Sequence, residues 1–211
     1  MSFLNKFYPD NVDRGIVNKI IFAHVFVLVL SQYLVTVSMN LPIMGIVKAS
    51  IWTFPLVYVI TDLTVRLFGR DAARNTILWA TIIGLALVPW VDMALGVDPI
   101  LAFRIAIAGS VAYGITTIMD AGLFQWLREK VNLWWVAPAV ASIISITIDT
   151  YAFFAMAFHA GPDAYMAVNW HLVASKHIFN KWIVSLIVVL PLYGIFLGYL
   201  AKKLGRPDIK A

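Results

Sequence analysis

Six long apolar segments constrain the fold of this chain more than any other feature. They cover residues 20–39, 50–68, 75–95, 100–126, 133–159 and 179–201. Each is close to the ~20 apolar residues that a helix needs to cross a bilayer, and none alternates like a membrane β-strand. The composition agrees, since 62% of the 211 residues are hydrophobic and 13% are charged, against about 45–50% and 25% in soluble domains. We therefore predict an all-α membrane protein with six transmembrane helices.

Basic residues gather at alternate ends of these segments. They are Lys6, Arg14 and Lys19 before the first segment, Arg66, Arg70 and Arg74 after the second, Arg128 and Lys130 after the fourth, and Lys202, Lys203, Arg206 and Lys210 after the sixth. Loops rich in Lys and Arg stay on the cytoplasmic side. Both termini are therefore predicted to be cytoplasmic, with residues 1–19 as an arm, 20–201 as one transmembrane domain and 202–211 as a tail.

Several function classes lack support in the sequence. The chain has no Cys, which excludes disulfides and thiolate metal sites. His159, His171 and His177 lack the spacing of a metal site, so no metal or cofactor is expected. GxxxxGK[ST], HExxH and GxSxG are missing, and we predict that the chain is not an enzyme; a membrane enzyme without a recognised motif is the alternative. The net charge of +5 fits positive loops beside a lipid bilayer, so no nucleic-acid partner is expected.

Ionisable residues inside the segments are the candidates for function. A charge at bilayer depth costs about 2.5–3.5 kcal/mol, so it must be paired, hydrated or used. Asp62 and Arg66 are four residues apart and share a helix face; Arg66 can also reach the cytoplasmic surface. Asp149 is the most deeply placed charge, and Ser142 and Ser145 lie on its face of the helix.

The other ionisable residues leave alternatives open. Asp120 either lies on a polar face of the fourth segment with Tyr113, Thr116 and Thr117, or it caps or pairs near the cytoplasmic end of that segment. Arg104 is predicted near the outer end of the same segment. Lys181, which follows Asn180 at the start of the sixth segment, is either the counter-charge of Asp149 or a residue that faces an outer cavity.

Two further features concern the packing of the helices. The loop at 160–178 is predicted to lie outside and to hold a short surface helix that begins near Pro162. Stripes of small residues allow close helix contacts; they are Ala102, Ala106, Ser110 and Gly114 on the fourth segment, and Gly194 and Gly198 on the sixth. These stripes indicate packing within the chain, and a homodimer contact is the alternative.

The stretch FPLVYVITDLTVRLFG at 54–69 resembles the signature of the queuosine-precursor transporters, a group of vitamin-uptake-like membrane proteins. Weaker matches follow in order over about 50–200: Arg104, Tyr113, Asp120, WWVAP at 134–138, DTYAFFAMAF at 149–158, PDAYMA at 162–167, Lys181 and PLYG at 191–194. One departure is Ile146, where an Asn or Gln is expected, and it leaves the polar partner of Asp149 open.

The resemblance implies a bacterial inner-membrane protein, similar in fold to the substrate-binding subunits of energy-coupling-factor transporters. It also implies import of 7-deazaguanine bases, 7-cyano-7-deazaguanine or 7-aminomethyl-7-deazaguanine, for the queuosine of tRNA. The alternative within transport is a substrate-binding subunit that needs a separate ATPase module.

A guanine-like base presents adjacent N–H donors that one carboxylate can accept together, and its ring stacks on aromatic side chains. We therefore expect Asp149 to bind the base edge, helped by Asp62 or Asn180. Arg104 and Lys181 are expected to neutralise the empty site, and Asp120 and Arg66 to serve in coupling or in an ion pair. The candidate aromatic walls are Trp52, Phe54, Tyr58 and Phe153.

Overall fold

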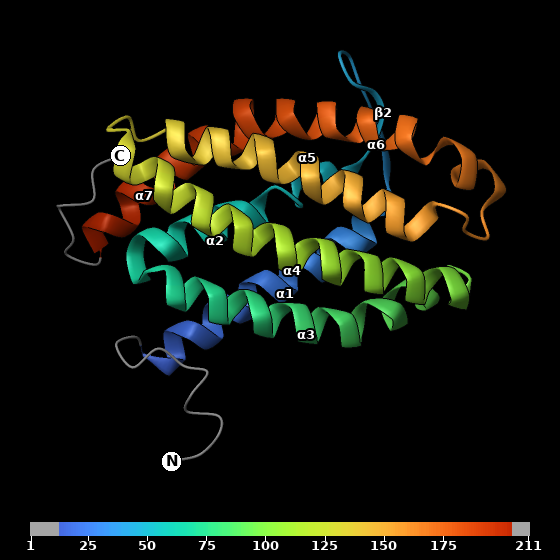
Figure 1. The fold of residues 1–211 in the computed structure, drawn as a ribbon, viewed down its shortest axis with the longest axis horizontal. Coiled ribbons are helices and arrows are strands. Elements are labelled where there is room, and N and C mark those ends of the chain that lie inside the picture. The colour runs from blue at the N-terminus through green and yellow to red at the C-terminus, as the bar shows by residue number, and fades with distance from the viewer. Residues whose placement is uncertain (1–12, 204–211) are drawn as a thin grey trace.

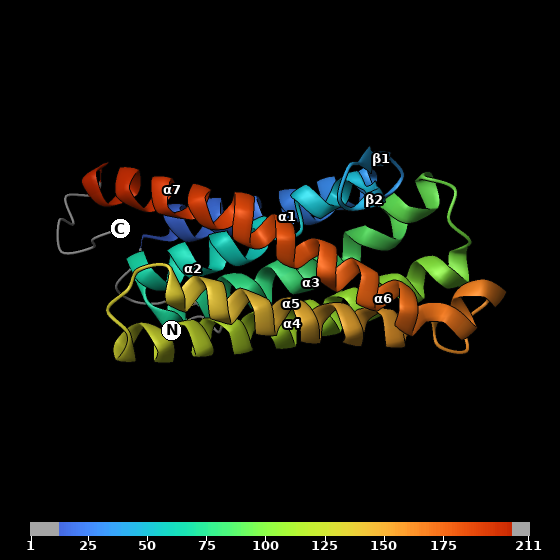
Figure 2. The same cartoon turned by 90° about the horizontal axis from the view of Figure 1, so that it is seen from above.

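Long helices packed side by side make up the computed structural model, which describes residues 13–203 (Figures 1 and 2). The helices and strands are α1 (Arg14–Val35), β1 (Ser38–Leu41), β2 (Gly45–Lys48), η2 (Ala49–Trp52), α2 (Leu56–Phe68), α3 (Arg70–Ala94), α4 (Pro99–Lys130), α5 (Val136–Phe158), α6 (Ala164–Val184), η3 (Ser185–Val189) and α7 (Leu190–Lys203). Six helical stretches are long and apolar enough to cross a membrane, which confirms the predicted number of spans. Most of the predicted arm and tail lies outside the described residues.

Local sequence signals explain where several helices begin. The Asp98 carboxylate accepts hydrogen bonds from the backbone N–H groups of Ile100 and Leu101, at 2.9 and 3.2 Å, and Pro99 occupies the first turn of α4. Asp163 caps α6 in the same way through Met166. An aspartate cap followed by proline satisfies N–H groups that no helical carbonyl can reach.

The second span is not one continuous helix. The short 3₁₀ helix η2 precedes α2, and Pro55 lies at the break between them because its ring cannot continue a preceding helical turn. A hairpin, β1–β2, comes before η2 and projects from the bundle in Figure 1. Its closing pair is Leu41 and Gly45, and Gly45 has a φ of 68°, which glycine adopts without strain. The sequence analysis did not predict this hairpin.

The predicted outer loop at 160–178 is wrong. Helix α6 begins at Ala164 and runs through η3 into α7, so that Ala164–Tyr199 forms one helical stretch of 36 residues. Such a stretch is about 54 Å long, whereas the hydrocarbon core is about 30 Å thick. The predicted helix start near Pro162 is confirmed, since α6 begins at Ala164, but this helix is not a short surface helix separate from the sixth span. A helix that extends beyond the bilayer carries the polar residues of its first turns equally well.

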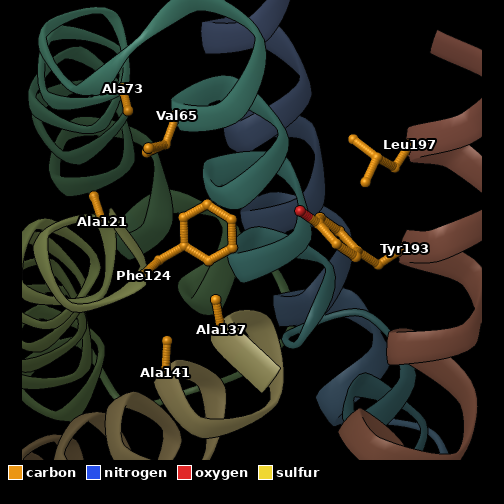
Figure 3. Packing of buried hydrophobic residues seen from close by; sticks show 8 residues of the cluster. All are labelled: Val65, Ala73, Ala121, Phe124, Ala137, Ala141, Tyr193 and Leu197. Atoms are coloured by element: carbon orange, nitrogen blue, oxygen red, sulfur yellow. The ribbon is translucent and has the colours of Figure 1, made fainter. Parts of the chain in front are cut away.

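The core at one end of the bundle is centred on Phe124, which packs against small and branched side chains of α2, α3 and α5 (Figure 3). Figure 3 also shows the Tyr193 hydroxyl of α7 pointing toward α2. Small residues permit this packing: a Cβ added at Gly194 would lie 2.7 Å from the Trp134 ring. The start of α1 and the end of α7 lie at the same end of the bundle (Figures 1 and 2).

Candidate functional site

Polar side chains spaced four residues apart occur on three helices that face one another. Because four residues are about one helical turn, each helix presents two polar groups on one face, about 6 Å apart along its axis. The pairs are Tyr58 and Asp62 on α2, Thr116 and Asp120 on α4, and Ser145 and Asp149 on α5.

The first layer contains Tyr58, Thr116 and Asp149. The Thr116 hydroxyl donates to Asp149 Oδ1 at 3.3 Å, and the Tyr58 hydroxyl lies within hydrogen-bonding reach of Thr116. Thr116 also donates to the Ala112 carbonyl of its own helix at 2.6 Å. Thr116 is therefore the polar partner of Asp149 that Ile146 cannot supply, and it comes from another helix.

Lys181 of α6 extends this layer. Its ammonium lies 3.8 Å from Asp149 Oδ2 and donates to the Thr150 hydroxyl at 2.9 Å, which confirms the alternative that Lys181 is the counter-charge of Asp149. Charge-assisted hydrogen bonds are about 2.7–2.9 Å long, so Asp149 Oδ2 is paired in charge but keeps acceptor capacity. The ammonium also lies 5.1 Å from the centre of the Phe54 ring, which brings one predicted aromatic wall to the pair.

The second layer contains Asp62, Asp120 and Ser145. Ser145 donates to Asp120 Oδ1 at 2.7 Å, and the carboxyl groups of Asp62 and Asp120 lie within hydrogen-bonding reach of each other. Asp62 is therefore held by Asp120, about one turn away from the Asp149 layer. On the next turn of α2, Arg66 donates to the Tyr193 hydroxyl at 3.3 Å.

The three carboxyl groups, those of Asp62, Asp120 and Asp149, differ in solvent exposure. Asp62 and Asp120 are 1% and 0% exposed, whereas the side chains of Lys181 and Asp149 are 12% and 22% exposed. A ligand can reach only a group that is accessible from outside the packed helices. Asp149 and Lys181 meet that condition, and the Asp62–Asp120 pair does not.

Arg104 is engaged elsewhere. Its guanidinium donates to the carbonyls of Ala157, Met156 and His159, at 3.0, 3.2 and 2.9 Å. These carbonyls end α5, where no helical N–H can reach them, and a cation is favoured there by the helix dipole. The structure therefore does not bring Arg104 to the Asp149–Lys181 pair.

The remaining candidates are Asn180, Trp52 and Phe153. Asn180 is buried next to Lys181 in α6. Trp52 packs against the apolar cluster of Val47, Ile51, Val184 and Val189. Phe153 packs edge-on against Phe154 and Phe158.

The sequence analysis missed two residues of these networks. Thr150 receives the Lys181 hydrogen bond, yet it stands beside Asp149 and looked like an ordinary helix residue. Tyr193 partners Arg66, and its place in the PLYG stretch was the one signal that could have identified it.

Six helical stretches among residues 13–203 are long and apolar enough to cross a membrane, and they define a multi-pass membrane protein with a partly accessible ion pair between α5 and α6. A family profile described as "Putative vitamin uptake transporter" matches residues 48–196. The chain belongs to this family of transporters. No solved structure gives a significant match, so the predicted likeness to energy-coupling-factor subunits stays a prediction.

Two curated relatives cover nearly the whole chain. The "Queuosine precursor transporter" of Escherichia coli (strain K12) is 35% identical over an alignment of 204 positions, which covers 89% of this chain and 90% of the relative. The "Probable queuosine precursor transporter" of Haemophilus influenzae (strain ATCC 51907 / DSM 11121 / KW20 / Rd) is 29% identical over an alignment of 227 positions, which covers 97% of this chain and 96% of the relative. The six apolar helices and these bacterial relatives identify a multi-pass inner-membrane protein.

Proposed function

We propose that the protein imports 7-deazaguanine bases, the precursors of queuosine, across the inner membrane. The observation that carries the proposal is the Asp149–Lys181 pair, which is buried among helices yet partly accessible. The names of both curated relatives support this substrate.

The chemistry of the pair fits the base. A 7-deazaguanine carries N1–H and an exocyclic amine side by side, and an ionised carboxylate accepts both. Asp149 keeps the capacity for this bond because Lys181 is 3.8 Å away and Thr116 occupies only Oδ1. The base therefore binds by its edge to Asp149, and Phe54 and Tyr58 lie close enough to the same layer to contact its ring.

Lys181 has a separate role in the empty protein. It neutralises Asp149, so that the unloaded site does not hold an uncompensated charge inside the bilayer. Binding of the base adds donors to Asp149 and leaves Lys181 held by Thr150. Arg104 keeps the end of α5 in place and does not contact the substrate.

The direct test is whether the chain restores queuosine formation in a bacterium that cannot make the precursor and lacks its own transporter. Supplied 7-cyano-7-deazaguanine should restore queuosine in tRNA only when this chain is expressed. The variant Asp149→Asn should fail at normal expression. The control Asp92→Asn changes another buried carboxylate, on α3, and should rescue like the wild type. Rescue by Asp149→Asn at the wild-type level contradicts the assigned site, and failure of the wild type contradicts the function.

A further inference from the structure

Two buried carboxyl groups in the second layer have no place in substrate binding. Asp62 on α2 and Asp120 on α4 are 1% and 0% exposed, and their carboxyl groups lie within hydrogen-bonding reach of each other. A carboxylate only accepts hydrogen bonds, so a hydrogen bond between two carboxyl groups requires a proton on one of them. Two neighbouring carboxyl groups in a buried site are not both ionised, because their negative charges repel each other.

The surroundings indicate which group holds the proton. Ser145 donates to Asp120 Oδ1 at 2.7 Å, and a donor favours the ionised form of the carboxylate that accepts it. Asp62 is then the acid that donates to Asp120. Among the described residues, Asp62 Oδ1 and Asp120 Oδ2 have no hydrogen-bond partner, and a proton held between the two carboxyl groups would give them one.

The charged and titratable groups around the pair come from several helices. Arg66 on α2 and Tyr193 on α7 lie within electrostatic range of Asp62, and Tyr58 on α2 lies within range of Asp120 and Asp149. On α5 the pair is faced by the neutral Ser145. A narrow crevice between α2, α5 and η3 reaches Asp62; its polar lining is Asp62, Ser142, Ser185 and Tyr193.

We propose that Asp62 and Asp120 share the proton that drives uptake, binding it in one state of the transport cycle and releasing it in the other. This inference rests on the proposed function. With the proton bound, the pair carries one negative charge and links α2 to α4. Release of the proton to water in the crevice leaves two carboxylates, which breaks the link and separates the helices. The next turns of the same helices carry Tyr58 and Thr116, so this separation also moves the partner of Asp149.

The functional test uses purified protein in liposomes that contain a pH-sensitive dye. An inward proton gradient should raise accumulation of labelled 7-cyano-7-deazaguanine by the wild type, and the added base should acidify the lumen. Asp62→Asn and Asp120→Asn should lose both effects while still binding the base, because an Asn amide supplies the hydrogen bond but carries no exchangeable charge. Asp92→Asn is the control and should keep both.

A second readout does not depend on transport. The infrared spectrum of the purified protein at neutral pH should show a protonated carboxyl C=O band that Asp62→Asn removes and Asp92→Asn leaves. Gradient-driven accumulation by the Asn variants at the wild-type level, or a spectrum in which Asp62→Asn removes no band, overturns the proposal. Uptake by the wild type that does not depend on the proton gradient overturns only the role of the proton in transport. If the wild type moves no base at all, the proposed function is overturned. In that case the infrared band alone tests whether Asp62 and Asp120 share a proton.

Discussion

Replacing Asp149 with Asn keeps the size of the side chain but exchanges one carboxylate oxygen for an NH₂ group. The amide offers the base one acceptor where the carboxylate offers two, and its N–H groups face the donors of the base. A hydrogen bond to a charged group contributes about 1.5–3 kcal/mol. The Kd for the base is therefore expected to rise roughly 10- to 150-fold. Thr116 approaches Oδ1 at 3.3 Å, and as a donor it cannot replace the lost acceptor.

This change is measured by titrating the purified protein with 7-cyano-7-deazaguanine in a calorimeter. Asp92→Asn is the matched control, and a thermal melt of each variant shows whether the fold is intact. Asp149→Glu, which keeps two carboxylate oxygens, should retain more affinity than Asp149→Asn. An Asp149→Asn protein that melts normally and binds within a factor of about two of the wild type, well below the change derived from one hydrogen bond, would refute the assignment of Asp149 to the base edge.

Three further predictions concern stability. Arg104→Gln should lower the free energy of unfolding by about 1–3 kcal/mol by uncapping α5 without changing the Kd for the base. A changed Kd with an unchanged melting temperature would show instead that Arg104 takes part in binding. Gly194→Ala should cost about 1–3 kcal/mol, since its Cβ would lie 2.7 Å from the Trp134 ring, and an unchanged melt would show that the ring can move aside. Asp149→Asn and Lys181→Gln combined should destabilise the protein by about 0.5–3 kcal/mol less than the sum of the single changes; strict additivity in denaturation measurements would contradict their pairing.

Much of the architecture could be predicted because it depends on local sequence. Six apolar runs of spanning length require six helices in a bilayer, where each backbone polar group must be satisfied within its own segment. The hairpin at 38–48 and the long helix from Ala164 could not be predicted in the same way. Their residues are of intermediate polarity, and contacts with neighbouring helices decide whether such residues form a loop, a strand or a helix.

The candidate site likewise has a part that the local sequence predicts and a part that contacts between helices decide. The buried charges Asp62, Asp120, Asp149 and Lys181 stand out in the sequence, because a charge in an apolar run is costly and needs a partner. Which partner each charge takes depends on how α2, α4, α5 and α6 are set against one another along their axes. That arrangement pairs Asp149 with Lys181 and Asp62 with Asp120.

The sequence by itself determined a six-span membrane protein with ionisable groups inside the bundle, because hydropathy and spacing within one helix are local properties. Only the tertiary structure decided that one carboxylate is accessible and paired with a cation, while two others are buried side by side where a narrow crevice reaches one of them. The physical reason is that burial and ion pairing are set by neighbours from other helices. The position of Arg104 at the end of α5, 53 residues away in sequence from the carbonyl of Ala157 that it binds, is decided in the same way.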